Sequence, residues 1–321
     1  MRDADNQHFV SIIIPALDEE KYISKCLMAL RNMAFPKEQY EIILVDNGSR
    51  DGTVEIAKEF GVEILEKPDG TIGSLRNYGA KHATGSILGF IDADCQVSIN
   101  WLRDALHNFA CPVVAAVGCR LAHDASTWVA KSWSLMHSAK VKEGETHWLP
   151  SGNMVVRRKY YDEVNGFDER LRTTEDYDLC QRLRKKGYVI YSDPKVASLH
   201  LDPPTHLSEF FKKELWHGKE MIRILGKKDI GILRYHALLY AILYVMIMIG
   251  IATGSVLYFT LQNKEFLIIF AVTALIFPLG LAFKTLSSPK KLLDLPCLTL
   301  VYMVYGLARA LCLLDIRNYF K

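Results

Sequence analysis

Several features that would assign a chain to a familiar class are missing from these 321 residues. The seven cysteines form no Cys-x-x-Cys pair and no series with metal-ligand spacing, so neither a zinc site nor a disulfide framework is indicated. Such an odd, scattered set fits reduced cytosolic thiols that act as small apolar residues. No Gly-x-Gly-x-x-Gly run follows the first apolar segment, which argues against a nicotinamide dinucleotide.

A large excess of one charge is also missing, since the net charge is only +3. This value alone indicates little, and no nucleic-acid partner is expected. No cleavable signal is visible, because residues 1–8 are polar and the next apolar run, Phe9 to Ile14, is short. We therefore expect a main domain that need not cross a membrane.

Charged residues are absent from a long stretch near the C-terminus. Tyr235 to Leu261 contains no Asp, Glu, Lys or Arg, and about twenty apolar residues suffice for a helix to cross a bilayer. Phe266 to Phe283 is a second apolar run, near the lower length limit. A third, Leu295 to Leu314, contains Arg309; a cation at mid-membrane costs about 2.5–3.5 kcal/mol, so this element either lies at the interface or packs against its neighbours. We expect two membrane spans, at about 236–261 and 266–283, and leave a third at 295–314 open.

Basic residues flank these runs unevenly. Seven precede the first run, three follow the second, and only Lys264 lies in the link between them. Because Lys and Arg stay on the cytoplasmic side, the large domain is expected in the cytosol and Gln262 to Glu265 outside. The stretch 209–234, with Phe210 and Trp216 among its lysines, fits either an interfacial helix that touches membrane lipids or a solvated helix face. The expected domains are 1–208, 209–234 and 235–321.

Strand-like and helix-like patterns alternate in the N-terminal part. This order predicts parallel crossover units, and hence an α/β, Rossmann-like, mostly parallel sheet with helices on both faces. Ligands bind at the carboxyl ends of the strands in such sheets. The expected elements are strand Val10–Pro15, helix Glu19–Asn32, strand Glu41–Val45, helix Asp51–Phe60, strand Val62–Glu66, helix Ile72–His82 and strand Ile87–Ile91.

Two carboxylates follow the fourth expected strand. In the run from Gly89 to Cys95, Asp92 and Asp94 are one residue apart. Alternation along an extended segment would put both on one side, facing a single divalent cation and the phosphates that it neutralises. Asp-x-Asp also occurs in solvated turns, so the motif alone leaves both interpretations open.

Polar residues follow the first two strands as well. Pro15 to Glu20 comes after the first and Asp46 to Gly52 after the second. A carboxylate at a strand end can accept hydrogen bonds from a base edge or a ribose, which suits Asp46. For the Gly-Ser-x-Asp-Gly run we favour loop and helix-capping roles over ligand contact.

Five motifs in this order resemble the family 2 glycosyltransferases of the GT-A fold, with C-terminal transmembrane helices added. The resemblance spans most of Val10 to about His200. It implies a nucleotide-diphosphate sugar across the strand ends and a divalent cation, Mg²⁺ or Mn²⁺, as cofactor. The matching pieces are Val10–Pro15 with Glu19–Glu20, Ile43–Ser49, Arg76–Ala80, Asp92–Asp94 and Thr174–Leu179.

The resemblance also implies roles for individual residues. Asp94, helped by Asp92, would hold the cation, which stabilises charge on the leaving phosphate. His200 stands where related transferases bring a further metal ligand, although a lone His is more often structural. Asn47 departs from the pattern, which often has Asp there, so the base recognised is left unspecified. Donor contacts are implied for Pro15, Ala16, Asp18, Glu20, Asp46, Asn47, Arg76, Asp92 and Ala93.

A turn at Leu149 to Met154 leads into a short apolar segment. Gly152 would permit close approach of a sugar, and Asn153 or Trp148 would contact it. A plain turn at the entry to a strand explains the same residues equally well.

The acceptor hydroxyl must lose its proton as it attacks, and a carboxylate beside it can act as general base. The resemblance assigns this role to Asp176, with Glu175 sharing or replacing it, and implies inversion at the anomeric carbon. The same acids suit a helix N-terminus capped by Thr173 or Thr174, and both interpretations can hold.

The presence of a base bears on the acceptor. A lipid phosphate is already ionised near neutral pH and needs no base, so we expect a hydroxyl of a saccharide or lipid-linked saccharide, with a polyprenyl phosphate as the alternative. The Gln-x-x-Arg-Trp motif of polymer-extruding synthases has no counterpart at Lys213 to Lys219, which favours single addition. A nucleotidyltransferase and a non-catalytic membrane scaffold are the alternatives from other classes.

Overall fold

The computed structural model describes residues 9–119, 121–137, 142–218, 232–262, 264–286 and 289–314. The chain divides into two compact units. The first comprises Met1–His123 and Lys140–Asp202, and the second comprises Asp124–Ala139 and Pro203–Lys321. A short segment from the middle of the sequence thus belongs with the C-terminal helices.

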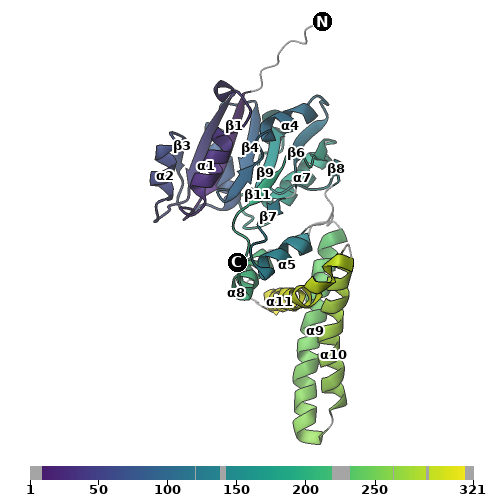
Figure 1. Ribbon diagram of the computed structural model, residues 1–321. Coiled ribbons are helices and arrows are strands. Elements are labelled where there is room, and N and C mark those ends of the chain that lie inside the picture. The colour runs from purple at the N-terminus through teal and green to yellow at the C-terminus, as the bar shows by residue number, and fades with distance from the viewer. Residues whose placement is uncertain are drawn as a thin grey trace. The chain divides into compact units, whose positions relative to one another are not determined.

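An eight-stranded sheet forms the centre of the first unit, in the order β3-β2-β1-β4-β9-β6-β10-β8 (Figure 1). The four expected strands are present and mutually parallel, as β1 (Val10–Ala16), β2 (Tyr40–Asp46), β3 (Glu63–Glu66) and β4 (Ile87–Ile91). The other half mixes directions, because β9 is antiparallel to both β4 and β6, and β8 is antiparallel to β10. These later strands are β6 (Val114–Gly118), β8 (Gly144–Thr146), β9 (Asn153–Arg157) and β10 (Val189–Ser192).

Helices cover both faces of this sheet, as the sequence predicts. Successive side chains of β1 point to opposite faces, so Ile12 and Ile14 enter one core and Ile13 the other. The first core is closed by α1 (Ile23–Arg31), α2 (Thr53–Glu59) and α4 (Trp101–Asn108). The second is closed by α3 (Ile72–His82), α6 (Arg158–Glu163) and α7 (Glu175–Lys185).

A separate three-stranded sheet lies at the end of β4. It consists of β5 (Cys95–Val97), β11 (Ser198–His200) and β7 (Ala122–His123) in the order β5-β11-β7. His200 pairs with Cys95 on one side and with His123 on the other. This small sheet carries His200 to the residues that follow β4.

The second unit is helical. It contains α5 (Trp128–His137), α8 (Leu207–Gly218), α9 (Ile232–Leu261), α10 (Glu265–Thr285), the 3-10 helix η2 (Pro289–Asp294) and α11 (Leu295–Leu314). The helices α9, α10 and α11 cover the three predicted apolar runs and are long and apolar enough to cross a membrane. Residues 219–231 of the expected interfacial segment lie outside the described residues. Phe210, expected at the lipid interface, is instead fully buried in an apolar cluster with Trp133 and Val301.

Candidate active site

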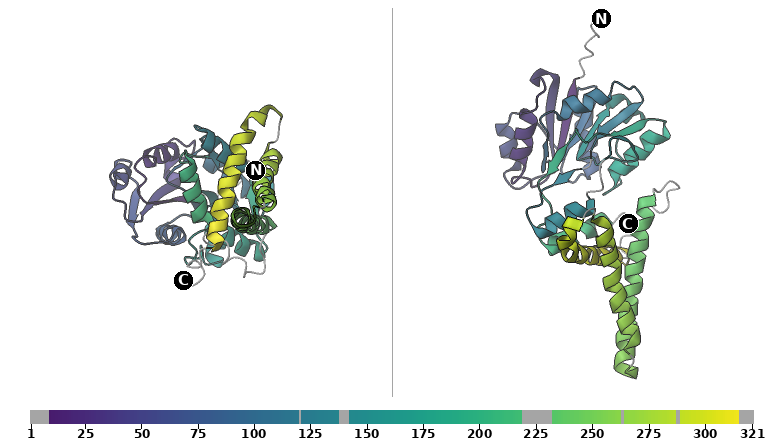
Figure 2. Two further views of the ribbon diagram at one scale, coloured as in Figure 1. Left: turned by 90° about the horizontal axis from the view of Figure 1, so that it is seen from below. Right: turned by 45° about the vertical axis from the view of Figure 1, so that its right-hand side comes forward.

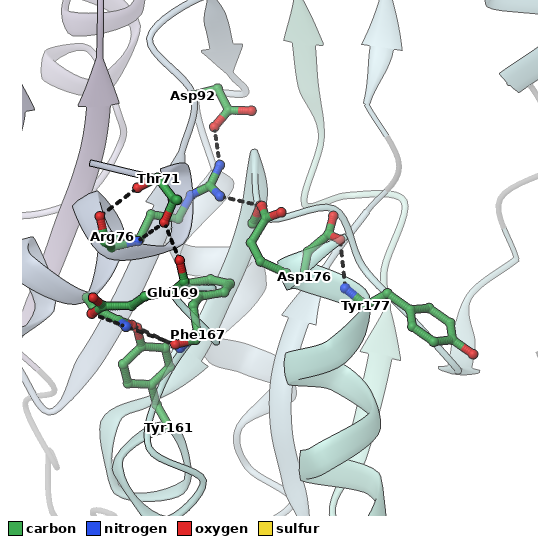
Figure 3. A network of polar contacts seen from close by, with 12 residues as sticks. Thr71, Arg76, Asp92, Tyr161, Phe167, Glu169, Asp176 and Tyr177 are labelled. Atoms are coloured by element: carbon green, nitrogen blue, oxygen red, sulfur yellow. Dashed lines mark hydrogen bonds and ion pairs between the residues drawn. The ribbon is translucent and has the colours of Figure 1, made fainter. Parts of the chain in front are cut away.

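Arg76 of α3 connects two acidic residues that are far apart in the sequence. Its guanidinium is 3% exposed and donates to Asp92 Oδ1 at 2.6 Å and to Glu175 Oε1 at 2.7 Å (Figure 3). Burying a cation is unfavourable unless opposite charges and hydrogen bonds compensate it, and here two carboxylates do so. The residue after β4 is therefore held in fixed geometry relative to the first residue of α7.

The next residue of α3 fixes the loop that leads into α7. The Asn77 side chain donates to the Phe167 carbonyl and accepts from the Phe167 amide, both at 2.9 Å, and it also accepts from the Tyr161 hydroxyl. Thr71 caps the start of α3 and donates to the Glu169 carbonyl at 2.9 Å (Figure 3). The helix α3 thus positions α7 both through its loop and through Glu175.

The start of α7 has an unusual backbone. Thr174 occupies the N-cap position with φ of 69°, in the left-handed region that a β-branched residue rarely adopts. Thr174 lies at the N-cap position, as expected. Its side chain, however, makes no capping hydrogen bond to the described first turn of α7. Glu175 is buried and also accepts from the Ser151 hydroxyl at 3.2 Å.

Asp176 is half-buried beside this network and accepts a hydrogen bond from the Tyr177 amide at 2.6 Å (Figure 3). Burial, and then the negative charge of Glu175, raise its pKa to about 7. The Tyr177 amide, the Trp148 indole and Arg76 act in the opposite direction. A carboxylate with a pKa near neutrality can accept a proton efficiently at physiological pH, as a general base must.

The two carboxylates after β4 have different partners, and the expectation that they lie along an extended segment is wrong. The strand ends at Ile91, and the Cys95 amide donates to the Asp92 carbonyl at 3.0 Å, so Asp92 to Asp94 form a turn rather than an extended segment. Alternation therefore does not apply. Asp92 turns toward Arg76, whereas Asp94 Oδ2 lies 3.1 Å from His200 Nε2.

Asp94 and His200 have the donor chemistry to hold a divalent cation. Among the described residues, no three His, Cys, Asp or Glu side chains gather as a complete metal site. One carboxylate and one imidazole still suit Mn²⁺, and Mg²⁺ is usually held by one or two carboxylates plus substrate phosphates and water. Burial, and then the negative charges of Asp94, Asp202 and Asp92, raise the pKa of Glu19 to about 8. The shift indicates a concentration of negative charge around Asp94, which a cation would neutralise.

His200 has a second possible role. Its Nδ1 accepts from the Asp202 amide at 3.3 Å, which leaves the ring hydrogen on Nε2, toward Asp94. In this arrangement the imidazole orients the Asp94 carboxylate. Direct metal ligation through Nε2 would move the ring hydrogen to Nδ1 and break the bond from Asp202.

The loops after β1 and β2 are bonded to each other. Asp18 accepts from the Arg50 amide at 2.8 Å, and Glu20 accepts from the Gly52 amide at 2.9 Å. Asp51 accepts from the amide of Thr53, the first residue of α2, although Gly52 occupies the N-cap position. The exposed carboxylates of Asp18 and Glu20 thus shape the rim of the strand ends.

Asp46 and Asn47 end β2 and organise the loops around them. Asp46 is buried and accepts from the Gly48 amide at 2.9 Å and the Ser49 hydroxyl at 2.5 Å. Asn47 exchanges two hydrogen bonds with the backbone of Gly70. Pro15 and Ala16 are buried at the end of neighbouring β1, and Ala93 is buried in the turn after β4.

Gly152 and Asn153 are placed differently from the expectation that they contact a sugar. A Cβ built on Gly152 would collide with the Asp92 carboxylate, so this glycine makes room for Asp92. Asn153 is fully buried, accepts from the Trp101 indole at 2.7 Å and donates to the carbonyls of Cys119 and Val196. Asn153 is therefore not placed to contact a sugar, because its side chain is buried and bonded to α4 and to the backbone of Cys119 and Val196.

Sequence reasoning gave no site role to Glu19, Asn77 and Ser151. Glu19 and Asn77 lie within motifs that carry the resemblance. Because they adjoin Glu20 and Arg76, they could have been predicted as site residues. Ser151 precedes Gly152 in a turn whose partner, Glu175, comes 24 residues later. A single sequence contains no pattern that reveals that contact.

Comparison with known proteins places this geometry in a family. Residues 11–167 match the model of "Glycosyl transferase family 2". The glycosyltransferase AglE of Haloferax volcanii is 30% identical over 241 residues, which cover 72% of this chain and 78% of that protein. This chain belongs to glycosyltransferase family 2. The resemblance stated from the motifs is thereby confirmed.

Other relatives extend the comparison. A Methanococcus voltae protein, 26% identical over 66% of this chain and 72% of its own length, is named dolichyl N-acetyl-α-D-glucosaminyl phosphate 3-β-D-2,3-diacetamido-2,3-dideoxy-β-D-glucuronosyltransferase. The mannosyltransferase PcManGT from Pyrobaculum calidifontis, solved with GDP-Man and Mn²⁺, has a TM-score of 0.61 at 18% identity, covering 98% of this chain and 87% of that one. TarS 1-349 of S. aureus, solved with UDP-GlcNAc, has a TM-score of 0.50 at 19% identity, covering 92% and 90%. These structures share the GT-A fold of the family 2 chain.

Proposed function

We propose that this family 2 glycosyltransferase is an inverting, metal-dependent enzyme that moves one sugar from a nucleotide-diphosphate sugar to a hydroxyl of a lipid-linked saccharide. One observation carries the proposal: Asp176, with a pKa near 7, adjoins a network from Glu175 through Arg76 to Asp92. The network joins a candidate base to the carboxyl edge of the parallel strands, where ligands of such sheets bind.

The chemistry follows from this placement. Asp176 takes the proton of the acceptor hydroxyl while the hydroxyl oxygen attacks the anomeric carbon. The bond between that carbon and the diphosphate breaks, and the nucleoside diphosphate leaves with the bonding electrons. Attack on the face opposite the leaving group inverts the configuration. Asp176 needs to be ionised for this step, which its pKa allows above about pH 7.

Donor binding is proposed at the strand ends. Pro15, Ala16 and Asp46 would meet the base and ribose, with the rim of Asp18 and Glu20 beside them. Asp94 would hold the divalent cation, with His200 as second ligand or as the group that orients it. A bound Mg²⁺ or Mn²⁺ would stabilise charge on the departing diphosphate. The nucleotide-sugar and Mn²⁺ complexes of PcManGT, and the UDP-GlcNAc complex of TarS, support this assignment by analogy.

A lipid-linked saccharide is the proposed acceptor for two reasons. A base is needed for a hydroxyl but not for a phosphate that is already ionised, and the Methanococcus relative is named for a dolichyl-linked sugar phosphate. The apolar C-terminal helices indicate membrane association, where such an acceptor is found. The distribution of basic residues favours a cytoplasmic catalytic unit.

The test offers the full chain a set of nucleotide sugars with Mn²⁺, Mg²⁺ or a chelator, and compares a lipid-linked saccharide with a bare polyprenyl phosphate. We expect product on the saccharide only, with an inverted anomeric centre by NMR, and none with chelator. Product on the polyprenyl phosphate alone would overturn the acceptor assignment. Pyrophosphate release from a nucleoside triphosphate would overturn the reaction class.

A further inference from the structure

The buried cation in the third apolar helix bears on how often the chain crosses the membrane. Arg309 of α11 donates to Glu214 Oε2 of α8 at 2.5 Å, and the Glu214 side chain is 2% exposed. The guanidinium also lies 4.9 Å from the centre of the Tyr305 ring. Arg309 is thus neutralised by a helix outside the three candidate spans.

The helix α8 runs beside α11 in the same direction. The contacts that show this are Phe210 with Val301 in one apolar cluster, Glu214 with Arg309, and the Leu215 carbonyl with the Cys312 thiol at 3.2 Å. Later residues of α8 contact later residues of α11, so the two helices are parallel. Wherever α11 lies in the bilayer, α8 therefore lies at a similar depth.

The opposite end of α11 is held from the same region of the chain. Lys131 of α5 forms an ion pair at 2.6 Å with Asp294, the residue directly before α11. Lys213 of α8 lies over the Trp133 ring of α5, 4.8 Å from its centre. Both ends of α11 are thus fixed to α5 and α8, two helices that precede α9 in the chain.

The charges of α8 exclude it from the hydrocarbon core. Its twelve residues include Glu209, Lys212, Lys213 and Glu214. On insertion scales, an Asp, Lys or Arg at the centre of a membrane helix is strongly unfavourable. A transmembrane α11 would draw these side chains into the bilayer, whereas an α11 at the interface leaves them among head groups and water.

The direction and surface of α11 agree with this. Figure 1 shows α9 and α10 lengthwise and α11 foreshortened, while the left view of Figure 2 shows α11 lengthwise and the other two end-on, so α11 crosses them. Its most exposed apolar side chains within the helix, Leu300, Leu307 and Leu314, recur every seven residues and form one stripe. The rest of α11 packs on α5 and α8 and on the ends of α9 and α10 that contain Tyr240 and Ala282. One exposed apolar stripe therefore remains, as expected for a helix that lies in the interface.

We infer that α11 lies in the plane of the membrane at head-group depth, beside α5 and α8, with the leucine stripe toward the acyl chains, and that only α9 and α10 cross the bilayer. The surface formed by α5, α8 and α11 then binds lipid. The C-terminal end of α11 is consequently on the same side of the membrane as α8. This inference is independent of the proposed reaction.

Thiol labelling of the full chain in sealed vesicles tests the topology. The probes are Leu293→Cys, 92% exposed before α11, a cysteine appended after Lys321, and Lys264→Cys between α9 and α10. Exposed native Cys111 marks the side of the first unit, Cys297 is replaced by Ser, and the buried thiols stay in place. An impermeant maleimide should modify Leu293→Cys and the appended cysteine from the side of Cys111, and Lys264→Cys from the opposite side only.

Two outcomes would overturn the inference. If the appended cysteine reacts from the side of Lys264→Cys, α11 spans the membrane. If Lys264→Cys reacts from the side of Cys111, α9 and α10 do not span it.

The depth of α11 in the bilayer gives an independent readout. A fluorophore on Leu307→Cys should be quenched by shallow lipid labels, and the matched probe Leu275→Cys at the middle of α10 by deep ones. Deep quenching at both positions would contradict an interfacial α11.

Discussion

In the described part of each unit an arginine is paired with a buried glutamate, and the two pairs have different consequences. In the first unit, Arg76 contacts Asp92 and Glu175, which come from two elements at the carboxyl edge of the sheet. In the second, Arg309 contacts Glu214 and the Tyr305 ring, between two parallel helices. A buried cation shared by two acids can align groups for chemistry, whereas one paired with a single acid fixes a helix.

The neighbours of each arginine sharpen this contrast. Asp176 adjoins the Arg76 network, is half-buried, and has its pKa raised to about 7. The side chains around Arg309 include Tyr305, Cys312 and Glu214. The Glu214 carboxylate is buried, so a sugar hydroxyl in water cannot reach it. Changes near Arg76 should therefore alter turnover, and changes near Arg309 should alter stability.

The largest expected effect is on turnover, from Asp176→Asn. Removing a general base lowers the transfer rate by about 10²- to 10⁴-fold, while donor binding stays close to that of the wild type. Radiolabelled sugar transfer and calorimetric titration of the donor measure the two quantities. The matched control is Asp178→Asn on the same helix, which breaks the i,i+4 pair with Arg182. Equal losses in both variants would refute the assignment of the base.

Next in size is the stability effect of Arg309→Met, which removes the guanidinium 2.5 Å from buried Glu214 and leaves it the His217 ring at 3.6 Å. Breaking a buried ion pair from one side costs about 3–5 kcal/mol of unfolding free energy. Thermal unfolding in detergent should show a marked fall in Tm, and the double variant Arg309→Met with Glu214→Gln should recover much of it. Lys264→Met, which removes an exposed cation, is the control and should leave Tm near the wild-type value. If the double variant is as unstable as Arg309→Met, the loss of stability does not come from the Glu214–Arg309 pair.

A smaller loss of turnover is expected for Arg76→Gln, because the network would hold Glu175 and Asp92 less firmly. Misplacement of catalytic groups by about 1 Å lowers rates by about 10²-fold. Arg76 also lowers the pKa of Asp176, so its removal should move the rising limb of the pH–rate profile to higher pH. Arg76→Lys should restore part of both effects. Arg170→Lys, at a pair whose arginine is 88% exposed, should change neither.

The parts of the structure that the sequence predicts are those encoded in contiguous residues. Apolar runs bounded by Pro15, Asp46 and Asp92 gave β1, β2 and β4, and the uncharged stretches gave α9 and α10. Alternation failed at Asp92 and Asp94 because β4 ends one residue earlier and a turn follows. Periodicity describes the strand itself and does not extend into the loop where the chemistry is placed.

The remaining features depend on contacts between distant residues. His200 reaches Asp94 through strands of two or three residues, too short to leave a pattern in the sequence. Asn153 is a polar residue at the start of a strand, and it is buried by contacts with Trp101 and with two carbonyls that are distant in the sequence. Glu214 precedes Arg309 by 95 residues. The charge of Arg309 showed that a partner or an interfacial position was needed, without showing which residue supplies it.

The pH dependence of sugar transfer in a single turnover tests the central claim most directly. An acid with its pKa raised to about 7 is ionised only above that pH, so the wild-type rate should rise about tenfold per pH unit up to pH 7 and then level off. The residual rate of Asp176→Asn should lack this limb. A wild-type rate that is flat from about pH 5.5 to 9, or the same limb in Asp176→Asn, would contradict Asp176 as the base.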